Sequence, residues 1–242
     1  MNPDALNQWR KGDRDRLVAA RLALDANTLD GLRRRIDAHL EQTFPGLALG
    51  GTATLAFCWP YQNEYDPRFL AHWLRQRGVR TALPVVVGPR QPMIFRQWAP
   101  GDPLEKGIYD IPYPATGEPV VPEVALVPMN GFDAAGYRLG YGGGFFDRTL
   151  AHLRAGGAKR PIVIGVTLEM ARIPTIEPQE WDIPMDYVTT ELGVYERIEG
   201  RLVLLGPPAR KHDTPGYSSP ACLAHEISLE QRDATGEPPS ST

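Results

Sequence analysis

The sequence predicts a single α/β domain with an open, mostly parallel sheet flanked by helices, a three-layer arrangement of the Rossmann type. Short apolar runs typical of buried strands alternate with stretches whose apolar residues recur at helical spacing. The length of 242 residues also suits one domain. We place this domain at residues 1–205 and expect a disordered tail over 206–242, where Pro, Ser, Thr and charged residues dominate.

The order of elements follows from periodicity and turn residues. We expect two helices between residues 13 and 40, with the second capped by Asn27 or Thr28. Further helices are expected at 69–77 and 144–153. Strands are expected at 52–59, 81–87 (broken by Pro84), 93–98 (an edge strand), 124–127, 161–166 and 187–190. An ordered loop over 100–122, a terminal hairpin or sheet extension over 193–198 and 201–205, and a short helix at 221–231 complete the prediction.

Composition excludes several classes of protein. The net charge of −3 argues against electrostatic binding of nucleic acid by the whole molecule. No apolar run approaches the roughly 18 residues of a membrane span, and the polar N-terminal segment does not resemble a signal peptide. The two cysteines lack metal-ligand spacing and predict no disulfide framework. We therefore expect a soluble, cytoplasmic protein that is a monomer or a weak dimer.

The most informative segment lies between residues 127 and 148 and reads as strand, loop and helix. Its glycines allow backbone N–H groups to approach a ligand closely, and the helix start that follows suits phosphate. Arg138 and Arg148 supply charge-assisted hydrogen bonds, while Asp133 and Asp147 are oxygen ligands suited to Mg²⁺. The spacing matches neither the dinucleotide fingerprint nor a Walker loop, so a flexible turn remains open from these residues alone. The glycines are Gly140, Gly142, Gly143 and Gly144.

The whole segment resembles the signature of the 5-formyltetrahydrofolate cyclo-ligase family, also called methenyltetrahydrofolate synthetase. That signature has a strand ending in Pro, then Phe-Asp, a Gly, Arg-Leu-Gly, a glycine-rich turn, two aromatic residues and Asp. The matching residues are Pro128, Phe132-Asp133, Gly136, Arg138-Leu139-Gly140, Gly142 to Gly144, Phe145-Phe146 and Asp147. The resemblance extends over roughly residues 10 to 195.

The resemblance implies an ATP site with Mg²⁺ beside it. Arg138 and Asp147 would be the catalytic residues, and Asp147 and Asp182 the metal ligands. Arg21 matches a further basic position of the family. From the residues alone, the basic residues of the first helix also fit a solvated charged helix end, and Asp182 a turn or helix cap. The implied ATP-binding residues are Arg10, Lys11, Arg14, Arg138, Gly140, Gly142, Gly143, Gly144, Phe145 and Phe146.

The resemblance also implies a reduced-folate site after the first strand. The family places a Glu there, and Glu64 stands at that position. A carboxylate in a loop at the end of a strand lies well for a ligand in the crevice of the sheet. Trp59 and Tyr61 are candidates to stack on the pterin, although their types fit core or loop packing equally well.

The implied activity is ATP-dependent conversion of 5-formyltetrahydrofolate to 5,10-methenyltetrahydrofolate with release of ADP and phosphate. Two other hypotheses stay open. One is a paralogue that keeps the ATP site and acts on a different small substrate, because Phe145 and Phe146 stand where the family usually has two tyrosines. The other is a nucleotide-binding protein without turnover.

Overall fold

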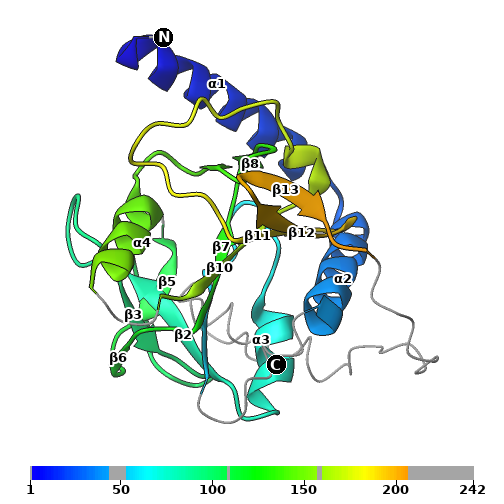
Figure 1. Cartoon of the computed structure of the whole chain (residues 1–242). Helices are drawn as coiled ribbons and strands as arrows, with labels where there is room; N and C mark the ends of the chain where they lie inside the picture. Colours follow the sequence, from blue (N-terminus) through cyan, green and yellow to red (C-terminus); the bar gives the residue numbers. More distant parts are fainter. Residues whose placement is uncertain (1, 44–52, 108–109, 157–159, 207–242) are drawn as a thin grey trace, which may run out of the picture.

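The computed structural model describes residues 2–43, 53–107, 110–156 and 160–206 (Figure 1). It confirms the predicted fold class, because a mixed sheet with a parallel centre is flanked by helices on both faces. Of the predicted tail at 206–242, residues 207–242, including the expected helix at 221–231, lie outside the described residues.

The main sheet has the strand order β13-β12-β11-β10-β7-β1-β2-β3-β6. Five central strands run parallel, and antiparallel pairs extend the sheet at both sides. The parallel strands are β1 (Thr54–Ala56), β2 (Arg80–Val85), β7 (Val124–Pro128), β10 (Ile162–Val166) and β11 (Tyr187–Thr190). The antiparallel strands are β3 (Ile94–Gln97), β6 (Pro119–Val120), β12 (Gly193–Ile198) and β13 (Arg201–Leu204).

The central strands are buried on both faces, as expected for a parallel sheet between helices. One face packs against α2 (Ala26–Thr43) and α3 (Arg68–Arg75) through a large aromatic and aliphatic cluster that contains Phe57, Trp59 and Trp98. The other face packs against α4 (Phe145–Ala155) through smaller side chains, including alanines on three neighbouring strands. Figure 1 shows α4 on one side of the sheet and α2 and α3 on the other, with α1 (Pro3–Leu22) crossing one end of the strands.

Both N-terminal helices begin earlier than predicted. Asn2 Oδ1 accepts a hydrogen bond from Ala5 N at 2.8 Å, and the helix α1 starts directly after it with proline in its first turn. The expected cap of α2 at Asn27 or Thr28 is wrong, because Asp25 Oδ1 accepts the Thr28 N–H at 3.0 Å. Polar residues stand at each position, so the sequence alone does not single out the cap.

Proline and glycine signals misled the prediction in two places. Pro84 does not break β2, because β1 pairs with β2 only as far as Ala82 and the Pro84 position pairs with β3 alone. The expected edge strand at 93–98 is not the edge, since two residues of β6 pair with it. The expected loop at 100–122 thus includes β6 and a hairpin of β4 (Leu104–Lys106) with β5 (Pro112–Pro114). For residues 193–198 and 201–205 a hairpin or a sheet extension was expected, and β12 and β13 form a hairpin.

Candidate functional site

The strand order places a crevice between β1 and β7. After β1 the chain continues to its neighbour β2 on one side, and after β7 it continues to its neighbour β10 on the other side. At such a switch point, the loops that follow the carboxyl ends of the two strands separate and leave room for a ligand. Here the loop after β1 carries Tyr61 to Glu64, and the loop after β7 carries the glycines, with α1 beside both. The two segments singled out by the sequence therefore meet at one place.

The glycine-rich segment forms a short hairpin and then an open turn. The strands β8 (Gly131–Phe132) and β9 (Arg138–Leu139) pair, and the turn Gly140–Gly144 leads into α4. Gly144 is the N-cap residue of α4, with φ 62°, and this cap makes no side-chain hydrogen bond. No capping side chain therefore accepts the N–H groups of the first turn of α4. Gly142 has φ 92° and is exposed. The turn thus offers backbone donors and the positive end of a helix to an anion.

Arg138 and Asp147 form a bidentate ion pair across this turn. The NH1–Oδ1 and NH2–Oδ2 distances are 2.8 and 2.9 Å, and the two side chains are only 5% and 15% exposed. Asp147 Oδ1 also accepts the Ile183 N–H at 3.1 Å. The guanidinium of Arg138 lies 5.6 Å from the ring centre of Phe146. The pair therefore ties the glycine turn to the start of α4 and to the segment before β11.

The basic residues predicted on α1 point to three different places. Arg14 Nε donates to the Gly140 carbonyl at 2.6 Å, and its guanidinium lies beside Gly142. Arg10 NH2 instead pairs with Asp182 Oδ2 at 2.6 Å and donates to the Glu177 carbonyl, and Arg10 Nε donates to the Ile176 carbonyl. Lys11 is 71% exposed and pairs with Asp15 at 2.8 Å. Of the three, Arg14 alone contacts the glycine turn among the contacts described here.

Glu64 lies at the centre of the other half of the site. Its Oε1 accepts the Tyr141 hydroxyl at 3.0 Å, and its Oε2 accepts the Tyr61 N–H at 3.0 Å. The buried Arg21 donates to the Tyr141 hydroxyl at 3.2 Å and to the Gln62 carbonyl at 2.8 Å. Burial raises the pKa of the Glu64 carboxyl, and the positive charge of Arg21 and the hydrogen bonds lower it in turn.

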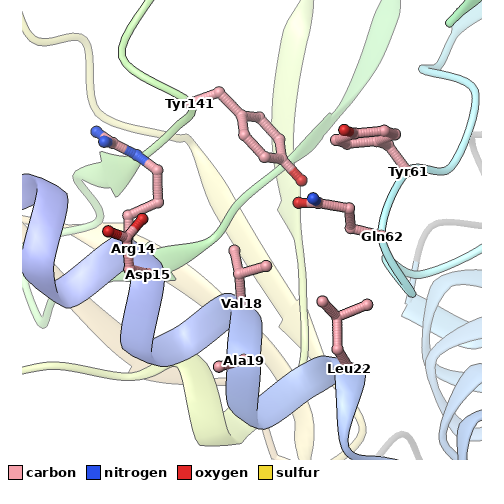
Figure 2. A pocket seen from close by; sticks show the side chains of 8 residues that line it. All are labelled: Arg14, Asp15, Val18, Ala19, Leu22, Tyr61, Gln62 and Tyr141. Carbon is pink, nitrogen blue, oxygen red and sulfur yellow. The ribbon is translucent and has the colours of Figure 1, made fainter. Parts of the chain in front are cut away.

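A pocket opens between α1 and these two loops, with a volume of about 380 Å³, in the range of small-molecule sites. Figure 2 shows Val18, Ala19 and Leu22 of α1 along one wall and the two tyrosine rings opposite them. The rings of Tyr61 and Tyr141 meet edge to face with centroids 5.7 Å apart. The remaining lining residues are Arg14, Asp15 and Gln62.

The half-buried Cys58 follows β1 and is a free thiol. Burial raises the pKa of Cys58, the Glu64 carboxylate raises it further, and the Arg138 guanidinium lowers it. One charged residue from each half of the site thus influences the pKa of this thiol.

Two residues predicted to contact a ligand or a metal have structural roles instead. Trp59 is 6% exposed and packs edge to face against Trp98 at 5.6 Å, so it belongs to the core rather than to the pterin pocket. Asp133 is buried and accepts the backbone N–H groups of Ala135, Tyr137 and Ile176 at 2.9 to 3.2 Å, so its carboxylate closes a turn rather than facing a metal. The type of each residue fitted both roles, and only the fold separates them.

The remaining predicted residues flank the glycine turn. Phe145 and Phe146 are half-buried in the first turn of α4. Arg148 donates to the Gly143 carbonyl and lies 5.3 Å from the Phe145 ring centre. Arg148 therefore closes the turn from outside, and its contact with phosphate stays a prediction.

The predicted metal ligands are each held by an arginine. Asp147 pairs with Arg138, and Asp182 pairs with Arg10 and also accepts the Gln179 N–H at 2.7 Å. Within the described part of the chain, no group of three or more His, Cys, Asp or Glu side chains is placed to hold a metal ion. This donor set fits Mg²⁺ that keeps its waters and the phosphate oxygens of a nucleotide, with one protein carboxylate at most.

Tyr141 and the apolar wall of α1 were not predicted from the sequence. Tyr141 stands between two glycines, and nothing in its surroundings marked it as a partner of a residue 77 positions away. Val18, Ala19 and Leu22 lie at helical spacing and are typical of a helix face packed on a core. Both become visible only when the loops after β1 and β7 lie beside α1.

An open α/β sheet with a glycine turn and a pocket at its switch point is typical of α/β proteins that bind small molecules at the carboxyl ends of their strands. The chain belongs to the 5-formyltetrahydrofolate cyclo-ligase family, whose model matches residues 7–191. No helix in the described ranges is long and apolar enough to cross a membrane.

Comparisons with individual proteins agree with this assignment. The chain is similar to the 5-formyltetrahydrofolate cyclo-ligase of Escherichia coli, with 29% identity over 64% of this chain and 85% of that protein. The cyclo-ligase of Mycolicibacterium smegmatis is 31% identical over 60% of this chain and 76% of its own length. The solution structure of Aquifex aeolicus 5,10-methenyltetrahydrofolate synthetase has a TM-score of 0.65 at 25% identity and covers 84% of this chain and 96% of that one.

Proposed function

We propose that this chain converts 5-formyltetrahydrofolate to 5,10-methenyltetrahydrofolate with ATP and Mg²⁺, releasing ADP and phosphate. Family membership supports the reaction class. The observation that carries the proposal is the meeting of two unlike half-sites at one switch point. One half offers cations and backbone N–H groups, and the other offers a carboxylate and two aromatic rings. A triphosphate and a pterin require these complementary surfaces.

The triphosphate is assigned to the glycine side. Arg14 and Arg138 lie at the glycine turn, and the start of α4 adds unpaired N–H groups. In this proposal, Asp147 holds the Arg138 guanidinium in the plane that suits bidentate contact with phosphate oxygens. Arg10 acts one step away, because its contacts fix the segment from Ile176 to Asp182 against α1.

The folate is assigned to the pocket side. The Glu64 side chain accepts N–H groups of the pterin, and Tyr61 offers a ring face or edge for stacking. Val18, Ala19 and Leu22 form the apolar wall. A carboxylate that is partly withdrawn from water and already held by donors discriminates well between ligands that can and cannot donate to it.

The chemistry requires alignment rather than a protein nucleophile. The formyl oxygen attacks the terminal phosphorus of ATP, and ADP leaves with the electrons of the broken P–O bond. Nitrogen 10 then attacks the activated carbon, phosphate leaves with its oxygen, and loss of a proton from nitrogen 10 completes the methenyl bridge. Bound Mg²⁺ would neutralise charge on the phosphates. The chain's own residues hold the two substrates in line and exclude water.

The test is an absorbance assay of the methenyl product with purified protein, 5-formyltetrahydrofolate, ATP and Mg²⁺. We expect product that depends on both ATP and Mg²⁺. No product, together with calorimetric binding of ATP, would move the assignment to a paralogue with another small substrate. We also place the protein in the cytoplasm, where ATP is available and the free thiol of Cys58 stays reduced.

A further inference from the structure

The described contacts place Tyr141 in both halves of the site. Its backbone lies in the glycine turn between Gly140 and Gly142, and its side chain reaches into the acidic half. In Figure 2 its hydroxyl end points across the pocket toward the loop that carries Tyr61 and Gln62. The residue therefore spans the distance between a ligand bound by the glycines and a ligand bound by Glu64.

The contacts at the two ends of Tyr141 are of different kinds. At the backbone end, Arg14 Nε donates to the carbonyl of the preceding Gly140, and the Arg14 guanidinium lies against Gly142 on the other side. Any anion that draws on Arg14 or on the glycine N–H groups therefore acts on the main chain on both sides of Tyr141. Gly142 has φ 92°, a backbone conformation that favours glycine, so the turn around Tyr141 has a specific shape.

At the side-chain end, the Tyr141 hydroxyl links Arg21 and Glu64 in a chain of hydrogen bonds. Arg21 donates to it at 3.2 Å, and it donates to Glu64 Oε1 at 3.0 Å. Burial and the nearby Glu64 carboxylate raise the pKa of Tyr141, so the hydroxyl stays protonated and remains a donor. The loop that receives this hydrogen bond contains two non-glycine residues in the left-handed region, Gln62 at φ 49° and Asn63 at φ 57°. Such a loop keeps its shape only while its surroundings hold it.

We propose that Tyr141 is a positioning residue that couples the two half-sites, so that a nucleotide on the glycine turn and a ligand at Glu64 each bind more tightly when the other is present. The coupling acts through the hydroxyl, which sets the direction of the Glu64 carboxylate when the glycine turn is ordered. This inference rests on the proposed function for the identity of the two ligands, but not for the existence of the coupling. Coupling of this kind is reciprocal and commonly amounts to about five-fold or more in affinity.

The first test is calorimetry with a non-hydrolysable ATP analogue and Mg²⁺, with and without saturating 5-formyltetrahydrofolate. We expect the folate to tighten analogue binding about five-fold or more in the natural protein and less than about two-fold in Tyr141→Phe. The matched control is Tyr137→Phe, in the β8–β9 hairpin just before the glycine turn, because the Tyr137 hydroxyl makes no hydrogen bond among the described residues. Equal coupling in Tyr141→Phe and the natural protein, or none in the natural protein, would overturn the proposal.

A second measurement keeps the coupling testable if the folate does not bind, an outcome that would instead count against the proposed function. The carboxyl carbon of Glu64 is followed by NMR in glutamate-labelled protein, assigned with Glu64→Gln, during titration with the ATP analogue alone. We expect the analogue to shift this signal in the natural protein and in Tyr137→Phe, but not in Tyr141→Phe. A shift of the same size in all three proteins would show that the hydroxyl of Tyr141 does not carry the coupling.

Discussion

The two halves of the site hold their charges in different ways. On the glycine side, charged partners touch directly, as in the pairs Arg138–Asp147 and Arg10–Asp182. On the acidic side, Glu64 is held by a hydroxyl and a backbone N–H, and its nearest cation, Arg21, acts across the Tyr141 hydroxyl. Removing one member of a buried ion pair leaves an uncompensated charge, whereas changing a carboxylate held by neutral donors mainly alters what it can bind. The glycine side should therefore respond in turnover and stability, and the acidic side in affinity.

The largest expected effect is that of Asp147→Asn. The change keeps the size of the side chain but removes the negative charge that holds the Arg138 guanidinium through two hydrogen bonds. We expect kcat to fall about 100-fold or more, with a loss of roughly 3 kcal/mol in the free energy of unfolding. Binding of 5-formyltetrahydrofolate, measured by calorimetry, should change less than about three-fold, since Glu64 is untouched.

The control for this variant is Asp13→Asn, which removes an ion pair on the exposed surface of α1. Its partner Arg16 is 60% exposed, so this variant should keep its activity and its stability to within about 0.5 kcal/mol. Turnover of Asp147→Asn close to that of the natural protein would show that the ion pair does not serve the reaction.

Glu64→Gln should produce the next largest effect, and on affinity. We expect the KM for the folate to rise about 10-fold or more, because a hydrogen bond to a charged acceptor contributes about 1.5–3 kcal/mol. Binding of the ATP analogue without folate should stay within about two-fold, as measured by calorimetry. The matched control is Glu105→Gln, which alters a Tyr–Glu hydrogen bond on the exposed hairpin of β4 and β5. A similar rise of the KM in both variants would contradict the assignment of Glu64 to the folate site.

The acidic loop has a further anchor whose charge depends on pH. Tyr65, next to Glu64, donates to Asp37 Oδ1 at 2.5 Å, and Arg33 pairs with the same carboxylate. Burial outweighs Arg33 and raises the pKa of Asp37 to about 7 from an ordinary 3.8. Between these two values the folded chain holds the proton that the unfolded chain releases. The free energy of unfolding should therefore fall as the pH rises through this window and level off above it.

Urea unfolding at several pH values between about 5 and 8 measures this contribution. The slope from Asp37 should reach at most about 1.4 kcal/mol per pH unit, and Asp37→Asn should remove it. Asp25→Asn is the control, because hydrogen bonds from Thr28 lower the pKa of Asp25 and it titrates below the window. An unchanged slope in Asp37→Asn would mean that Asp37 is ionised throughout.

The glycine side was the half that the sequence predicted well, and its chemistry explains why. Apart from Arg14, which reaches the turn from α1, its main residues lie within one segment, and Arg138, the glycines and Asp147 fall nine residues apart or less. Glycine spacing, flanking charges and a following helix are local signals that survive without knowledge of the fold. The paired state of Asp147 was not predicted, because an Asp after a glycine turn has the same appearance whether it faces a metal or an arginine.

The acidic side depends on contacts between distant segments, and the sequence predicted less of it. Glu64 was predicted from the family resemblance, which places a Glu after the first strand. Its partners lie far away in the sequence, with Tyr141 77 residues after it and Arg21 43 residues before it. Trp59 and Tyr61 are neighbouring aromatics of similar promise, yet one packs on Trp98 and the other lines the pocket. Residues two apart on an extended strand share a face, so strand alternation does not separate these two rings. The chain has left β1 before Trp59 and turns at Gln62 and Asn63, and only the fold shows which ring meets the core.

The smallest expected effects concern the two phenylalanines before Asp147, where the family usually has tyrosines. Phe145 lies toward Arg148 and the exposed Gly143, so a hydroxyl added there stays near water. Phe146 instead packs partly against the smaller-residue face of the core. We expect Phe145→Tyr to change kcat/KM less than about three-fold and stability less than about 0.5 kcal/mol, while Phe146→Tyr costs about 1 kcal/mol. Thermal unfolding and the methenyl assay on both variants give the comparison. A ten-fold gain in turnover from Phe145→Tyr would mean that the missing hydroxyl limits the reaction, and would favour a different natural substrate for this glycine turn.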